Sequence, residues 1–105
     1  MIIITGSITA RADTFEELQA LSLAHTHRSR TEDGCLLHSV HVDVENKLKL
    51  VFVEHWRDRS AVLKHFALSG SRAFSKAAAR LAASPPKIAI FDASKIPLGS
   101  FLAGS

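Results

Sequence analysis

The feature that most constrains the fold of this chain is an apolar strand that passes with almost no loop into a helix. Residues 48–53 are rich in branched and aromatic side chains, as is typical of a buried strand, and Glu54-His55-Trp56 ends the run. Asp58 follows in the position of a helix N-cap, and the helix that it opens carries His65. Because this helix must fold back over the same sheet, the sequence predicts polar groups enclosed between a helix and apolar walls. Such a place can orient a small aromatic ligand.

The rest of the chain alternates between strand and helix patterns. We expect further strands at 2–11, 35–43 and 87–92, a first helix from Thr14 to about Arg30, and a last helix that opens at Ser71. Thr14 and Glu17 have the spacing of a capping box, and Ser84-Pro85-Pro86 ends the last helix. The order is β-α-β-β-α-β with the second helix broken in two. It predicts an α+β, ferredoxin-like fold, in which an antiparallel four-stranded sheet carries its helices on one face.

The two central strands are apolar on both faces. If their hairpin closes around Glu45-Asn46, His38 shares one face with His55, and the other face collects Phe52, Glu54 and Trp56. The inner sides of the later helices are expected to carry Val62, Leu63 and Phe66, and then Phe74, Ala77, Ala78 and Leu81. An antiparallel sheet with one face in water should show a polar face, and neither face here does. We therefore expect a homodimer with the two sheets face to face, although the tail, with Ile96, Leu98, Phe101 and Leu102, is an alternative cover.

Composition narrows the class of protein. The chain has 105 residues, which suits one domain, and its 13 basic and 10 acidic residues are scattered, so no nucleic-acid partner is expected. No apolar run reaches the roughly 20 residues of a membrane span, so no membrane partner is expected. Met1 to Ile4 is too short for the apolar part of a secretion signal. The single Cys35 cannot form an internal disulfide, which suits a cytoplasmic protein.

The six histidines raise the question of a metal site. His38 and His41 are three apart on a strand and point to opposite faces, while His25 and His27 are two apart on a helix and also diverge. His38 and His55 share a face in the expected hairpin, and a third ligand from a partner subunit stays open. We predict no metal site from these spacings.

A succession of short motifs resembles a known family. Glu32-Asp33-Gly34-Cys35 precedes the hairpin, and Glu54-His55-Trp56, Asp58, His65 and Phe74 follow in order. Over residues 1–92 the chain resembles the antibiotic biosynthesis monooxygenase family, which leaves 93–105 as a C-terminal tail. The resemblance implies a dimeric α+β barrel, in which two ferredoxin-like subunits close their sheets against each other. It also implies a pocket in each subunit, between the helices and the sheet.

Two departures limit what the resemblance implies. Phe52 stands where the cofactor-free polyketide oxygenases of the family have an Asn, four residues before the strand Trp. Gly6 or Ser7, and Ala78, stand where haem-degrading relatives have an Asn and a His. Haem degradation is therefore not expected. His65 and Trp56 are the matches that we carry over.

Two functions follow from the resemblance and the residues. In the first, the protein is a monooxygenase that oxidises a small quinol or phenol with O2 and no cofactor. In the second, it is a non-catalytic dimer that binds a small apolar molecule or serves a structural role. For the first, we predict His65 as the base, with Trp56 and Glu54 also catalytic. The predicted substrate-binding residues are Phe66, Phe74, His55 and Arg72.

Each of these residues also has a structural interpretation. Trp56 can be a half-buried aromatic that satisfies its indole N–H, and His65 can brace the neighbouring strand. Glu54 can be an ion-pair partner, and Arg72 can belong to a solvated helix face together with Lys76 and Arg80.

Overall fold

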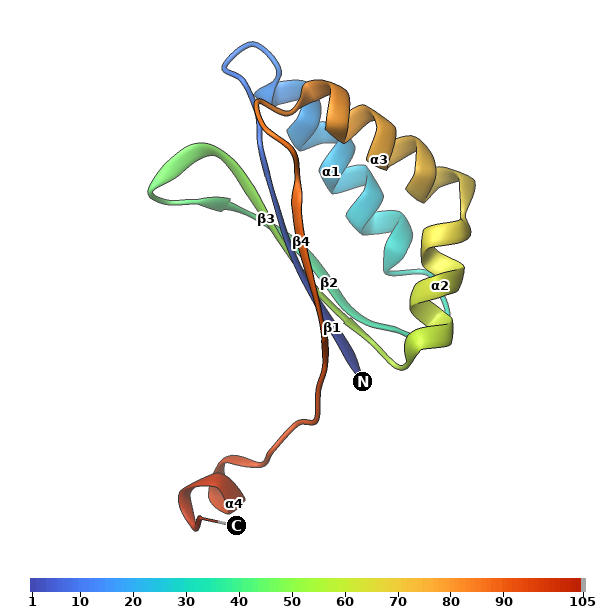
Figure 1. The fold of residues 1–105 in the computed structure, drawn as a ribbon, viewed down its shortest axis with the longest axis vertical. Helices are drawn as coiled ribbons and strands as arrows, with labels where there is room; N and C mark the ends of the chain where they lie inside the picture. The colour runs from blue at the N-terminus through green and yellow to red at the C-terminus, as the bar shows by residue number, and fades with distance from the viewer. Residues whose placement is uncertain (105) are drawn as a thin grey trace.

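The computed structural model describes residues 1–104, which form a four-stranded antiparallel sheet with helices packed on one face (Figure 1). The strands are β1 (Ile2–Thr9), β2 (Cys35–Asp43), β3 (Asn46–Trp56) and β4 (Lys87–Asp92). The helices are α1 (Phe15–Ser29), α2 (Arg59–Ala67), α3 (Ser69–Leu81) and the short α4 (Leu98–Leu102) in the tail. The strand order β2-β3-β1-β4 confirms the ferredoxin-like prediction. The break in the second helix is also confirmed, because Leu68 is extended between α2 and α3.

The core lies between the sheet and the helices. Ile8 of β1 and Leu50 of β3 are buried there against Leu18 of α1 and Leu81 of α3. A second group, around Ile4, joins the start of α2 to the sheet. Burial of such a side chain stabilises a fold by roughly 1.5–3 kcal/mol, and these contacts fix α1 and α3 over the sheet.

The hairpin between β2 and β3 has a register that differs from our prediction. Asp43 pairs with Asn46, so the turn is Val44-Glu45, but Val42 pairs with Leu50. From Val42 back to Leu37 the pairing therefore lies one residue away from the predicted one. Because a shift of one residue exchanges the two faces of a strand, His38 pairs with Glu54 on the side of the helices. The prediction that His38 and His55 share a face was therefore wrong.

The two predicted helix N-caps, at Asp58 and Thr14, have different outcomes in the structure. Asp58 caps α2 as predicted, because its carboxylate accepts a hydrogen bond from the backbone N–H of Ala61 at 2.9 Å. The capping box at Thr14 does not form. Its hydroxyl instead donates to the carbonyl of Leu81 at 2.7 Å, which ties the start of α1 to the end of α3. A tertiary partner thus replaces the local one.

The inner side of α2 also differs from the prediction. Ala61, Val62 and His65 are buried, whereas Leu63 and Phe66 are exposed. The helix begins at Arg59, directly after Asp58, whose carboxylate accepts from the N–H of Ala61. This starting point sets which residues of α2 face the sheet. Val62 was predicted correctly. For α3, the predicted Ala78 and Leu81 are buried, and Phe74 packs partly buried against the core.

The sheet face opposite the helices is uncovered in the single chain (Figure 1). Strand alternation places Ile3, Val51 and Val53 on this face, all partly buried, together with the exposed Leu37 and Phe91. The tail runs away from the sheet, and its apolar residues are exposed (Figure 1). Within residues 1–104, no helix is both long and apolar enough to cross a membrane.

Candidate functional site

A cleft of about 950 Å³ lies between α3 and the β1–β4 side of the sheet. Its size falls in the range of small-molecule sites. Ile4 and Ile8 of β1, Phe52 of β3 and Phe74 of α3 supply apolar walls. Gly6 forms part of the floor, and a Cβ atom there would lie 3.2 Å from the carbonyl oxygen of Lys87. The absence of a side chain at Gly6 thus allows the close approach of β4 to β1 at this point.

His65 of α2 lines the cleft and is held by a carboxylate. Its Nδ1 lies 2.8 Å from Oε1 of Glu32, and the hydroxyl oxygen of Ser71 lies 3.4 Å from the same nitrogen. Glu32 stands in the connection between α1 and β2. That connection turns at Gly34, whose φ of 85° is in the left-handed region and whose carbonyl accepts from the N–H of Arg57 at 2.8 Å. The turn therefore brings Glu32 back to the helix that carries His65.

Glu54 lines the cleft from β3 and joins two further rings. The indole N–H of Trp56 donates to its Oε1 at 2.9 Å, and Nε2 of His38 lies 3.4 Å from the same oxygen. The His38 contact is close enough for an ion pair but is not aligned as a hydrogen bond, and both ring nitrogens of His38 are buried without a hydrogen-bond partner in residues 1–104. Burial raises the pKa of Glu54, but His38 and the Trp56 donor lower it more, so the pKa lies below its ordinary value. Glu54 is thus an acceptor at neutral pH.

His25 enters the cleft from α1. Its ring stacks on Phe74 with centroids 4.3 Å apart, and its Nδ1 lies 3.3 Å from a guanidinium nitrogen of Arg28. Burial lowers the pKa of His25 to about 3, with further lowering from His65 and His38. His25 is therefore an uncharged imidazole at neutral pH.

The outer part of the cleft is more polar. Phe66 lies here, 41% exposed, beside Arg72, Lys76 and Lys87. The guanidinium of Arg72 donates to the carbonyl of Ala67 at 3.1 and 3.3 Å, which holds it near the junction of α2 and α3. The mouth of the cleft thus carries positive charge, while its interior is largely apolar.

The structure brings together most of the predicted site residues and separates two of them. Glu54, His65, Phe66, Arg72 and Phe74 line one cleft. Trp56 does not reach the cleft, because it is fully buried beneath His65 with ring centroids 4.6 Å apart. His55 points to the uncovered face of the sheet, because it alternates with Glu54 and Trp56 along β3.

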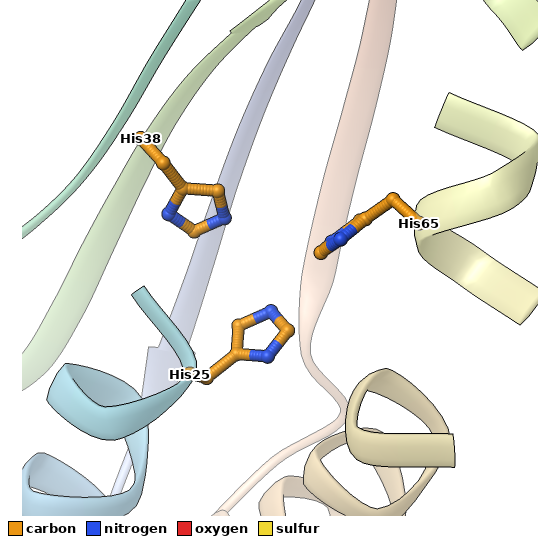
Figure 2. Close-up of side chains that lie close together, drawn as sticks. All are labelled: His25, His38 and His65. Carbon is orange, nitrogen blue, oxygen red and sulfur yellow. The ribbon is translucent and has the colours of Figure 1, made fainter. Parts of the chain in front are cut away.

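Three residues of the site were missed in the sequence: Glu32, His25 and His38. The imidazoles of His25, His38 and His65 converge from α1, β2 and α2 (Figure 2). The predicted spacings paired His38 with His41 and His25 with His27 within single elements, and across elements they paired His38 only with His55. A comparison across elements, with the shifted hairpin register, is the signal that could have found the cluster.

Comparisons with known proteins agree with this geometry. The sequence model described as "Antibiotic biosynthesis monooxygenase" matches residues 1–77. A relative from Synechocystis, the uncharacterized protein sll1783, is 33% identical over 90 residues, which cover 86% of this chain and 61% of that protein. The chain therefore spans about three-fifths of the length of this relative.

Solved structures show the same fold. A crystal structure from Deinococcus radiodurans, described as that of a proposed antibiotic biosynthesis monooxygenase, has a TM-score of 0.87 and 30% identity, and covers 92% of this chain and 96% of that one. PA3566 from Pseudomonas aeruginosa has a TM-score of 0.80 and 26% identity, with 90% and 94% covered. Rv0793 from Mycobacterium tuberculosis shares the fold, with a TM-score of 0.84 at 21% identity over 90% and 96% of the two chains. With residues 1–77 matched by the family's own sequence model, this chain belongs to the antibiotic biosynthesis monooxygenase family.

Proposed function

We propose that the protein is a monooxygenase that oxidises a small electron-rich aromatic, of the quinol or phenol type, with O2 and without a bound cofactor. The observation that carries this proposal is the 2.8 Å contact between Nδ1 of His65 and the Glu32 carboxylate, in a ring that lines an apolar cleft. Family membership supports the reaction class. The cleft supports the substrate class, because its phenylalanine walls suit a flat apolar ring.

The geometry at His65 suits proton abstraction. A carboxylate accepts from Nδ1–H, so Nε2 carries the lone pair that can take a phenolic proton. Glu32 then stabilises the imidazolium that forms, in the manner of a carboxylate–histidine pair. Trp56 packs against the ring from below and fixes its orientation.

Deprotonation makes the substrate a stronger electron donor. A quinolate is a far better reductant than the neutral quinol, and it passes electrons to O2 within the cleft. For a simple quinol, the overall reaction with one O2 gives one hydroxyquinone and one water. One oxygen atom enters the ring and the other leaves as water, and the substrate supplies all four electrons, so no external reductant is needed.

Glu54 and Arg72 have supporting roles in this proposal. Glu54, held by the Trp56 indole, lines the cleft as an acceptor for a second substrate hydroxyl. Arg72 at the mouth offers a positive charge to a substrate oxygen. Phe66 and Phe74 flank the ring from the helix side.

The assembly that we propose is a homodimer. The apolar face of the sheet, with Ile3, Val51 and Val53, has no cover within the described chain, and a second copy is the simplest one. The domain of each subunit then extends to Asp92, because β4 pairs with β1 along its length, and residues 93–105 form the tail.

A binding protein without turnover is the second candidate. Phe52 favours it, because it makes the floor of the cleft apolar at the place where oxygenases of the family have an Asn. Such a protein would hold the same aromatic molecules in the same cleft.

Oxygen labelling separates the two candidates. Metal-free protein is mixed with a panel of quinols and anthrones under ¹⁸O2, and the products are analysed by mass spectrometry. The proposal expects one labelled oxygen per product at a rate well above the spontaneous oxidation. Saturable binding of a panel member without labelled product above background would favour the binding protein.

A further inference from the structure

Three buried imidazoles meet at the inner wall of the cleft, which His25 and His65 line. His25, His38 and His65 each place one ring nitrogen so that these atoms all lie within 4.8 Å of one another (Figure 2). The side chains are 6%, 2% and 3% exposed. They come from α1, β2 and α2, so the tertiary fold, and no local spacing, produces the cluster.

The ring of His38 is only weakly satisfied, because its one polar neighbour is the Glu54 carboxylate, 3.4 Å from Nε2 and not aligned for a hydrogen bond. Both of its ring nitrogens are buried without a hydrogen-bond partner among the described residues. A buried polar group left unsatisfied costs on the order of 1–3 kcal/mol. An apolar side chain would therefore stabilise this position better, unless the ring binds something.

The surroundings are those of a metal-binding histidine cluster. Metal ligands commonly direct their other ring nitrogen at a carboxylate, which fixes the ring and raises its basicity. Glu32 holds Nδ1 of His65 in this way, and Oε1 of Glu54 lies 3.4 Å from Nε2 of His38. Trp56 in turn holds Glu54. The two carboxylates favour a nearby positive ion electrostatically, and the guanidinium of Arg28, 3.3 Å from Nδ1 of His25, opposes it in part.

We propose that His25, His38 and His65 form a binding site for a divalent transition metal ion of the kind that prefers imidazole, such as Zn²⁺ or Co²⁺. A tetrahedral ion with bonds of about 2.0–2.1 Å to nitrogen needs ligand atoms about 3.3 Å apart. The ligand atoms here lie within 4.8 Å of one another, so the rings must approach one another to bind the ion. Three protein ligands leave a fourth position for water or a ligand, and His25 and His65 place the cluster at the wall of the cleft.

A metal ion at this site would affect catalysis, and this consequence rests on the proposed function. Because Glu32 holds Nδ1 of His65, Nε2 is the nitrogen left both for a metal and for a substrate proton. The ion and the proton therefore compete for one atom. Bound metal should suppress the cofactor-free oxidation, and a chelator should restore it.

Cobalt binding tests the site without reference to activity. Protein freed of metal with a chelator is titrated with Co²⁺ and followed by visible absorption, and with Zn²⁺ followed by calorimetry and thermal unfolding. We expect the intense visible bands of low-coordinate cobalt, one ion per chain, and a higher Tm with Zn²⁺. Glu32→Gln should weaken the affinity by roughly 10–100-fold, as is typical when a partner of a metal ligand is lost.

Histidine variants identify the ligands. His25→Ala, His38→Ala and His65→Ala should each lose the cobalt bands and the Zn²⁺-induced rise in Tm. The matched control is His27→Ala, an exposed histidine of α1 that should bind as the wild type does. Circular dichroism shows whether each variant folds, and if an alanine variant does not, the glutamine variant at the same position replaces it.

Absence of the bands and of the Tm shift in folded wild-type protein would overturn the site. So would unchanged metal binding in all three folded histidine variants, because the ion would then sit elsewhere. Neither outcome depends on turnover. If the protein binds the metal but oxidises no quinol, the result would support the metal site and contradict the proposed function.

Discussion

Nδ1 of His65 on α2 and the carboxylate of Glu32 before β2 lie 2.8 Å apart, although 33 positions separate them in the sequence. The pair links the connection between α1 and β2 to α2, and its His65 lines the cleft. In the proposed reaction, this contact selects the tautomer of His65 and stabilises its protonated form.

Replacement of the carboxylate tests that role. Glu32→Gln keeps the size of the side chain but removes the charge that stabilises the imidazolium, so we expect turnover to fall by about 10-fold or more, with a smaller change in KM. Glu45→Gln, in the exposed hairpin turn, is the control and should match the wild type. Equal kcat in Glu32→Gln and wild type would show that the contact is only structural.

The turn at Gly34 positions Glu32, and its substitution should be costly. A Cβ atom at Gly34 would lie 2.6 Å from Cβ of Ala61, and its φ of 85° disfavours any other residue. The left-handed conformation alone costs about 1–2 kcal/mol, so Gly34→Ala should lower the free energy of unfolding in urea by at least that amount. Gly99→Ala is the control, because nothing lies within 4 Å of a Cβ atom there. Similar urea midpoints for the two variants would contradict the strained turn.

The cap of α2 gives a pH-dependent prediction. The Ala61 N–H and the guanidinium of Arg57 lower the pKa of Asp58 below its ordinary value of 3.8. A lowered pKa in the folded state means that the carboxylate stabilises the fold above 3.8, and that this stability is lost as the pH falls through the lower, folded-state pKa. Asp58→Ala should therefore have a lower Tm than wild type at neutral pH, and the gap should narrow in acid below pH 3.8. A gap that stays constant into strong acid would show that the charge of Asp58 is irrelevant.

The uncovered sheet face predicts the assembly. Val53→Asp places a charge in the middle of this face, so we expect the wild type to be a dimer by light scattering and the variant to be a monomer at the same concentration. Leu63→Asp, on the exposed side of α2, is the control and should stay dimeric. A wild-type monomer at micromolar concentration would exclude the sheet-to-sheet dimer.

The order of elements was predictable because each strand and helix carries its own periodicity and end signals. The helix cap at Asp58 depends on adjacent residues alone, and it appears where expected. The end of α3 lies at Leu81, before the predicted stop at Ser84-Pro85-Pro86. The bond from Thr14 to Leu81 crosses 67 positions, so no local pattern reveals it.

The candidate site was predictable only in part, because some of its contacts join segments that are far apart in the sequence. Glu54 stands at the end of β3 and His65 on the helix that follows, so their proximity follows from the order of elements along the chain. The histidine cluster depends on the register of the β2–β3 hairpin, which changes at the irregularity between Val42 and Asp43. This register decides whether His38 faces the helices. The position of Glu32 depends on the turn at Gly34, whose carbonyl accepts from the N–H of Arg57 and which leaves no room for a Cβ atom beside Ala61.

Oxygen uptake by metal-free His65→Ala, compared with wild type, tests the central claim most directly. The proposal predicts that loss of the base lowers kcat for a quinol substrate by roughly 10²-fold or more, while His27→Ala keeps wild-type turnover. Circular dichroism of His65→Ala should show a folded protein. Equal oxygen uptake by folded His65→Ala and wild type would contradict the account, because His65 would then have no part in the chemistry.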